Sequence, residues 1–266
     1  MRPLEQHLKP FKWYRDLAAR KARLEAGAFI VEGARAIKQI IAGQPEEIIE
    51  ILTVDEPLPV YSNYSVRQIT ESQLLYICNT RTPQGALAVV KQPKDIYSDS
   101  LPSKTGDKVL LLEDIQDPGN VGALIRTAAA FGFSGVIMTG KCADPLAPKC
   151  VQSTAGTLLS VWLRRTAAYL ELAAALKTAG YFLVEADIRG EIEPAILSRQ
   201  NKLVLALGNE GAGLSSGLLA MADYLLRIPI DTDRAESLNV AACGAICMYL
   251  SSLKNDWRPG QSGVST

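Results

Sequence analysis

Three polar, glycine-rich stretches in the second half of the chain carry the residues best suited to chemistry. They span residues 113–128, 207–215 and 228–242, and their candidate functional residues are Asn120, Arg126, Glu210, Ser237 and Asn239. A guanidinium binds a phosphate or stabilises negative charge that develops on a reacting oxygen. A carboxylate or a hydroxyl can take part in moving a proton, and amides orient such groups.

Each candidate also has an ordinary structural interpretation, and both interpretations stay open. Asn120 could cap a helix that begins directly after it. Arg126, in an otherwise apolar helix, could be a snorkelling or ion-paired arginine. The glycines around Glu210 could form a plain turn before a helix, although they also let the backbone approach a ligand closely. Ser237 is a typical N-cap residue, whereas Asn239 would fall in the first helical turn, where no cap role requires it.

The composition excludes several classes of enzyme. The only histidine is His7, near the start of the chain, so a Ser-His-Asp hydrolase and a histidine-ligated metal site are not expected. The five cysteines are scattered without a C-x-x-C pair, which argues against a zinc site or a disulfide framework. With 28 basic and 28 acidic residues, the net charge neither favours nor excludes a nucleic-acid partner. We expect no bound metal.

The apolar segments predict neither a secretory signal nor a membrane span. The start of the chain lacks an apolar run of the kind that signal peptides contain. The longest apolar run, residues 240–250, is shorter than the roughly 20 residues that cross a bilayer. A reducing cytoplasm fits these features best.

The second half of the chain alternates between strand-like and helix-like segments. The predicted strands are residues 108–115, 135–140, 181–187, 202–208 and 224–230, and the predicted helices include residues 121–132, 169–180 and 237–253. This alternation predicts an α/β domain with a mainly parallel sheet and helices on both faces. Ligands of such sheets collect beyond the carboxyl ends of the strands, where the three polar stretches lie.

The first half predicts a smaller α/β domain. Its expected strands are residues 29–33, 46–54, 65–70 and 85–93, and its expected helices are residues 34–43 and 72–78, preceded by a basic amphipathic helix over residues 10–26. The polar sequence near residue 100 is typical of a linker. We therefore predict an N-terminal domain (residues 1–93), a linker (94–107), a second domain (108–256) and a flexible tail (257–266).

Taken together, the motifs resemble the SpoU (TrmH-like) family of the SPOUT RNA methyltransferases. The sequences that carry the resemblance are DPGNVGALIRTAAAFG, LVLALGNEGAGLS and IPIDTDRAESLNVAACGAI, in this order. In the first half, FIVEGARAI and NTRTPQGALAVV resemble the N-terminal substrate-binding domain of the family, whose fold is similar to that of a ribosomal RNA-binding protein. The likeness covers residues 20–253, and the triple match is far more specific than any single motif.

The resemblance implies a reaction, a cofactor and an assembly. It implies transfer of a methyl group from S-adenosylmethionine to a ribose 2′-hydroxyl of structured RNA, with ribosomal RNA preferred over transfer RNA. It also implies a trefoil knot whose loops hold the cofactor, and a homodimer whose active site is completed across the interface. The residues carried over to the cofactor site are Leu207, Gly208, Ile228 and Leu238, and those carried over to catalysis are Asn120, Arg126, Glu210, Ser237 and Asn239.

A local basic surface would have to bind the RNA, since the net charge is zero. The candidate residues are Arg20, Lys21, Arg23, Arg35 and Arg81. A solvated helix surface and a plain turn at Arg81 are the competing interpretations.

Other functions stay as alternatives. A non-catalytic RNA-binding assembly factor could share this scaffold, although it would be expected to lose some of the catalytic set. Base methylation and methylation of transfer RNA are further possibilities within the same family. A Rossmann-type nucleotide enzyme is disfavoured because no strand-GxGxxG-helix unit opens the sheet.

Overall fold

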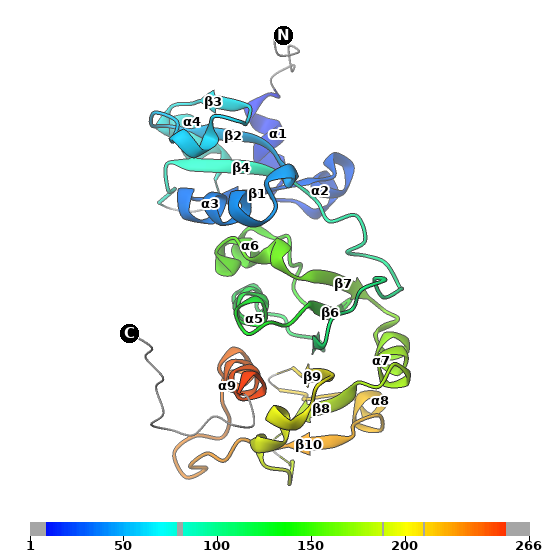
Figure 1. The fold of residues 1–266 in the computed structure, drawn as a ribbon. Helices are drawn as coiled ribbons and strands as arrows, with labels where there is room; N and C mark the ends of the chain where they lie inside the picture. Colours follow the sequence, from blue (N-terminus) through cyan, green and yellow to red (C-terminus); the bar gives the residue numbers. More distant parts are fainter. Residues whose placement is uncertain (1–8, 79–81, 188, 210, 254–266) are drawn as a thin grey trace, which may run out of the picture. The chain divides into compact units, whose positions relative to one another are not determined.

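The computed structural model describes residues 9–78, 82–187, 189–209 and 211–253 of the 266-residue chain (Figure 1). The chain forms two compact units. The first consists of Met1–Lys94 and Asp144–Ser160, and the second of Asp95–Ala143 and Val161–Thr266.

The first unit contains a four-stranded sheet with the strand order β1-β4-β2-β3. Its strands are β1 (Ala28–Glu32), β4 (Ala86–Lys91), β2 (Ile48–Thr53) and β3 (Val66–Gln68). β4 is antiparallel to both of its neighbours, and only β2 and β3 run parallel. These strands, together with α3 (Ala34–Gly43) and α4 (Glu71–Ile77), confirm the elements predicted for the first half of the chain.

The single basic helix predicted over residues 10–26 is wrong. The segment forms two helices, α1 (Phe11–Asp16) and α2 (Arg20–Ala26), with a break around the buried Leu17. At this break the Arg23 guanidinium donates hydrogen bonds to the carbonyl oxygens of Leu17 (2.9 Å) and Ala18 (2.6 Å). These bonds satisfy carbonyl oxygens that the end of α1 leaves free. The chain can therefore turn here without burying carbonyl groups that lack a hydrogen-bond donor.

Residues 144–160 lie within the methyltransferase-like half of the sequence but belong to the first unit. They contain α6 (Pro148–Thr154), a helix that the sequence pattern did not predict. Gly156 has a φ of +91°, and a Cβ at this position would lie 2.6 Å from the carbonyl oxygen of Ala36 in α3. Glycine is therefore required where this segment approaches α3.

The second unit is built on six parallel strands in the order β10-β8-β9-β5-β6-β7. Their bounds are β5 (Lys108–Leu112), β6 (Gly135–Thr139), β7 (Trp162–Thr166), β8 (Phe182–Ala186), β9 (Leu203–Leu207) and β10 (Tyr224–Leu226). The helices are α5 (Pro118–Ala130), α7 (Tyr169–Thr178), α8 (Ser216–Leu219) and α9 (Val240–Ser252). Helices α5 and α9 lie on one face of the sheet, and α7 and α8 lie on the other (Figure 1). The predicted doubly covered parallel sheet is confirmed.

Short 3-10 helices complete the described secondary structure. They are η1 (Pro45–Glu47), η2 (Pro59–Tyr61), η3 (Leu158–Ser160) and η4 (Pro194–Arg199). No helix among the described residues is both long and apolar enough to span a membrane. The trefoil knot stays a prediction.

The segment that joins the two units is held along β7. The Arg164 side chain donates to the carbonyl oxygen of Ser100 (2.7 Å), and the indole N–H of Trp162 donates to that of Thr105 (3.1 Å). Ile96 is fully buried. The polar composition that predicts a linker here therefore corresponds to a packed connection, because strand side chains satisfy its backbone.

Candidate cofactor pocket and active site

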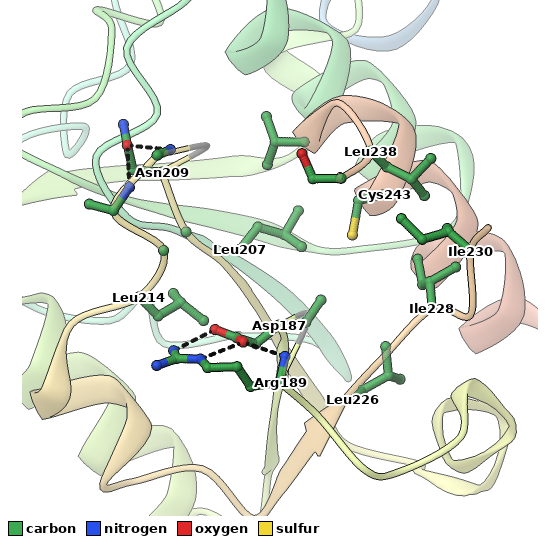
Figure 2. Close-up of a pocket in the computed structure, with 17 residues that line it drawn as sticks. Asp187, Arg189, Leu207, Asn209, Leu214, Leu226, Ile228, Ile230, Leu238 and Cys243 are labelled. Atoms are coloured by element: carbon green, nitrogen blue, oxygen red, sulfur yellow. Dashed lines mark hydrogen bonds and ion pairs between the residues drawn. The ribbon is translucent and has the colours of Figure 1, made fainter. Parts of the chain in front are cut away.

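A pocket of about 290 Å³ lies at the carboxyl ends of β8, β9 and β10 (Figure 2). Its size is near the lower end for small-molecule sites. The four residues predicted to bind the cofactor all line this pocket, namely Leu207, Gly208, Ile228 and Leu238. Ser237, a predicted catalytic residue, lines it as well. Three segments that are distant in the sequence therefore converge on one cavity.

The loop that follows β9 forms one wall of the pocket. A Cβ on Gly208 would lie 2.5 Å from the carbonyl carbon of Gly213, so the close approach of these two backbones requires glycine. The Asn209 side chain holds the loop, since its Oδ1 accepts from the N–H groups of Gly211 (2.9 Å) and Ala212 (3.0 Å). Its Nδ2 donates to the carbonyl oxygen of Asp114 (2.9 Å), which ties the loop to the end of β5. Glu210 lies outside the described residues.

A buried carboxylate fixes the far end of the same loop. Glu113 directly follows β5 and is only 4% exposed. Its two oxygens accept from the N–H of Ser215 (2.6 Å) and from the hydroxyl of Tyr169 (2.7 Å). Asp114, the next residue, has a positive φ of 57°, which a residue with a side chain seldom adopts. The backbone at the end of β5 is thus shaped by two acidic residues that sequence reasoning did not single out.

Asp187 and Arg189 are pocket residues that the sequence analysis missed. The Asp187 side chain, 7% exposed, forms an ion pair of 2.7 Å with the Arg189 guanidinium (Figure 2). Hydrogen bonds from Arg189 hold the pKa of Asp187 below its ordinary range, so this carboxylate is anionic at neutral pH. Asp187 directly follows β8 and Arg189 lies two residues later, and the general rule that ligands bind beyond strand ends was the available signal.

A second unusual carboxyl group lies two residues before Asp187. Glu185 in β8 is fully buried, and neither of its side-chain oxygens has a hydrogen-bond partner among the described residues. Burial, followed by the charges of Glu113 and Asp187, raises the pKa of Glu185 from the ordinary 4.5 to about 7. Glu185 is therefore partly protonated at neutral pH.

Two of the predicted catalytic residues are in contact. The Nδ2 of Asn239 donates to the Oδ1 of Asn120 at 3.2 Å. Asn239 is also the N-cap of α9, because its Oδ1 accepts from the N–H groups of Ala241 (2.9 Å) and Ala242 (3.3 Å). The prediction that Ser237 caps this helix is therefore wrong.

The capping interpretation of Asn120 is wrong as well. Helix α5 begins at Pro118, and Asp117 is its N-cap, with a side chain that accepts from the N–H of Asn120 at 2.9 Å. Asn120 thus lies inside the first turn of α5. Its side chain is left to interact with Asn239.

Arg126 is exposed on α5 and does not line the pocket of its own chain. Among the described residues, its guanidinium has neither a carboxylate partner nor a hydrogen bond. The ion-paired interpretation of Arg126 therefore finds no support in the described part of the chain. Over those same residues, no group of three or more His, Cys, Asp or Glu side chains that could hold a metal ion occurs.

The predicted RNA-binding residues have different surroundings. Arg20, Lys21 and Arg35 are exposed on the first unit. Arg23 is 2% exposed and forms a 2.5 Å ion pair with Asp144, so its side chain is not available to a phosphate. This burial corrects the expectation that Arg23 is part of a basic surface. Arg81 lies outside the described residues.

The parallel sheet, the glycine-containing loop beside the cavity and the Asn120–Asn239 contact all lie in the second half of the chain. The profile of the SpoU rRNA Methylase family matches residues 107–249, which is more than half of the chain. The chain belongs to the SpoU rRNA methylase family. A second profile, the MRM3-like substrate binding domain, matches residues 10–88. The family resemblance inferred from the three motifs is confirmed.

Members of the SpoU family resemble this chain over most of its length. The 23S rRNA (guanosine(2553)-2'-O)-methyltransferase RlmP of Bacillus subtilis is 30% identical over 90% of this chain and 94% of its own. The SpoU methyltransferase AviRb from Streptomyces viridochromogenes, crystallised with AdoMet, superposes with a TM-score of 0.77 at 28% identity, over 91% of this chain and 96% of its own. The AdoMet-bound rRNA methyltransferase from Sinorhizobium meliloti gives a TM-score of 0.75 at 27% identity, over 91% and 93% of the two chains.

Proposed function

We propose that this protein transfers a methyl group from S-adenosylmethionine to a ribose 2′-hydroxyl of ribosomal RNA. The observation that carries the proposal is the convergence of Leu207, Gly208, Ile228 and Leu238, from separate loops, on one cavity of a SpoU-family chain. The chemistry of the cavity suits the cofactor. Apolar side chains can pack against its base, and backbone groups of the glycine-containing loop and the Asp187 carboxylate can bind its polar parts.

The bound cofactor supplies a methyl group that is already activated, and the side chains must align the hydroxyl and handle its proton. Arg126 binds the phosphate beside the target ribose and stabilises negative charge on its oxygen, because a guanidinium remains protonated. Glu210, Ser237 or a water molecule accepts the proton. Asn120 and Asn239, which contact each other at 3.2 Å, orient these groups.

A homodimer accounts for the separation of Arg126 from the pocket. Helix α9 and its C-cap residue, Leu253, present an exposed or half-exposed apolar stripe of Ala242, Ile246, Tyr249 and Leu253, with helical spacing. Ile246 is 38% exposed and Tyr249 is 43% exposed, so this face of α9 presents large apolar side chains that a partner subunit could cover. We assign this stripe to a subunit interface, through which Arg126 of one copy reaches the pocket of the other.

The first unit supplies the RNA-binding surface in this proposal. Arg20 and Lys21 on α2 and Arg35 on α3 are exposed cations of this unit, and phosphate contacts from such residues position the RNA without selecting its sequence. Ribosomal RNA is the substrate in this proposal, so the cytoplasm is the compartment in which the protein acts.

Transfer of labelled methyl groups tests the proposal. The purified protein is incubated with labelled S-adenosylmethionine and with 23S rRNA, 16S rRNA or tRNA, and the product is digested with alkali. A ribose 2′-O-methyl group blocks cleavage at its own linkage, whereas a methylated base does not. Labelled, alkali-resistant dinucleotides from rRNA support the proposal. Label in tRNA selects the transfer-RNA alternative, and RNA binding without transfer selects the assembly factor.

A further inference from the structure

We infer that the Asp187 carboxylate accepts a hydrogen bond from a ribose hydroxyl of the adenosyl group, and that the ion pair with Arg189 holds the carboxylate in that orientation. The inference rests on the proposed function, since it assumes that the pocket holds S-adenosylmethionine. It concerns a specificity-determining residue that none of the three sequence motifs contains.

The hydrogen bonds of Asp187 leave one acceptor position free. Its Oδ1 accepts from the backbone N–H and from the Nε of Arg189, both at 2.8 Å. Among the residues that the structure describes, its Oδ2 accepts only from a terminal nitrogen of Arg189, at 2.7 Å. Because each carboxylate oxygen accepts about two hydrogen bonds, Oδ1 is filled and Oδ2 retains one position.

The free position lies on the pocket side. A Cβ on Gly213 would lie 3.8 Å from Asp187 Oδ2, and Gly213 itself lines the pocket. In Figure 2 the Asp187 carboxylate faces the Arg189 guanidinium beside Leu214, and Asp187, Leu214 and Leu226 all line the cavity. A ligand in the cavity can therefore reach Oδ2 without displacing Arg189.

The neighbours of Asp187 identify the part of the cofactor that meets it. The N–H of Asp187 donates to the carbonyl oxygen of Leu226 at 2.9 Å, so the two residues are adjacent. Leu226, Ile228 and Ile230 form an apolar wall that suits the flat base of the cofactor. The ribose is attached directly to that base. Its hydroxyls are donors, and an anionic carboxylate is purely an acceptor.

Ser237 and Leu238 also line the pocket, immediately before Asn239 and its contact with Asn120. We assign the amino-acid end of the cofactor, which carries the reacting methyl group, to this part of the pocket because the predicted catalytic residues lie there. An Asp187 that met the amino group would leave the ribose without a charged partner. The geometry favours the ribose.

Binding of cofactor fragments tests the inference without any turnover. Isothermal titration calorimetry measures the affinities of S-adenosylhomocysteine, 5′-methylthioadenosine, and the 2′-deoxy and 3′-deoxy forms of 5′-methylthioadenosine. Asp187→Asn should weaken S-adenosylhomocysteine and 5′-methylthioadenosine by the same factor, about 10- to 100-fold for a charge-assisted hydrogen bond. Glu191→Gln, which removes an exposed carboxylate from the same loop, should change neither affinity.

The deoxy ligands keep the test independent of how well the variant folds. In the wild-type protein, one of the two deoxy ligands should lose about the same factor as Asp187→Asn, and the variant should not distinguish that ligand from its parent. Equal binding of all three methylthioadenosines to the wild type overturns the inference. So does a loss confined to S-adenosylhomocysteine, which would assign Asp187 to the amino-acid end. If the wild type binds none of the ligands, the proposed function fails as well.

Discussion

The side-chain amide of Asn239 donates to the side-chain oxygen of Asn120 at 3.2 Å, and this bond joins residues that are 119 positions apart. One carboxamide thus performs two tasks, because its oxygen caps α9 while its nitrogen meets the first turn of α5. The two tasks can be separated by substitution.

Asn239→Asp should retain the cap and lose the donor. Aspartate is as good an N-cap as asparagine, so the free energy of unfolding should change by less than about 0.5 kcal/mol. Methyl transfer should fall at least about tenfold, because Asn120 loses its donor. Asn239→Ala, the matched control, should also lose about 1 kcal/mol of stability, measured by urea unfolding. A fully active Asn239→Asp enzyme would mean that catalysis does not need the contact.

Arg126→Ala should abolish turnover and spare cofactor binding. The side chain is exposed and does not line the pocket, so stability should stay within about 0.5 kcal/mol of wild type. Single-turnover rates should drop about 100-fold or more, while the Kd for S-adenosylhomocysteine stays unchanged. A large rise of that Kd would place Arg126 against the cofactor instead.

Substitution of the α9 stripe should separate the subunits of the proposed homodimer. Ile246→Glu combined with Tyr249→Glu introduces charges into the proposed apolar interface, and analytical ultracentrifugation should then detect monomers with little activity. As a complement, Arg126→Ala and Gly208→Val proteins, each inactive, should regain partial activity when they are coexpressed. Failure to regain activity, with mixed dimers present, would refute an active site shared between subunits.

The contribution of Glu185 to the stability of the protein should decrease as the pH rises from about 4.5 to about 7. The folded state raises the pKa of Glu185 from 4.5 to about 7, so it holds this proton more tightly than the unfolded chain does. The stabilisation is complete below about pH 4.5 and is lost as the pH approaches 7, with an amplitude of about 3 kcal/mol. Glu185→Gln should flatten this part of the profile in urea titrations. An unchanged slope in the variant would assign the proton to another group.

Substitution of Arg23 should affect stability, whereas substitution of the exposed Arg20 and Lys21 should affect RNA binding. Arg23→Ala leaves Asp144 as an unpaired, largely buried carboxylate and should cost about 3 kcal/mol of stability. Arg20→Ala with Lys21→Ala should leave the melting temperature nearly unchanged, but weaken RNA binding and reduce its salt dependence. The contrast is measured by calorimetry and by filter binding at two salt concentrations. RNA affinity that the double variant retains in full would exclude α2 from the RNA surface.

The sequence predicts the sheet and the loops that line the pocket well because these features depend on local patterns. Continuous apolar runs identified the buried strands, and glycines next to polar residues identified the loops around Gly208. Strand β7 escaped prediction because Arg164 and Arg165 interrupt its apolar pattern, and the sheet nevertheless buries Arg164 almost completely.

Features that depend on distant contacts could not be predicted from sequence. Nothing local distinguishes Arg23, which is buried against Asp144, from the exposed Arg20 and Lys21. Asp187 likewise follows its strand as an ordinary polar residue, and only the neighbouring Gly213 and Leu226 make it part of a pocket. Tertiary packing decides the role of such side chains.

The membership of residues 144–160 in the first unit affects how the protein can be divided. A fragment that starts at residue 107 would retain α6 but lose β1 and α3, which pack near it. Cys150, Val151 and Leu158, which are buried in the whole chain, would then face solvent. Such a truncated methyltransferase would be prone to aggregation. A soluble catalytic fragment would require a short linker in place of residues 144–160.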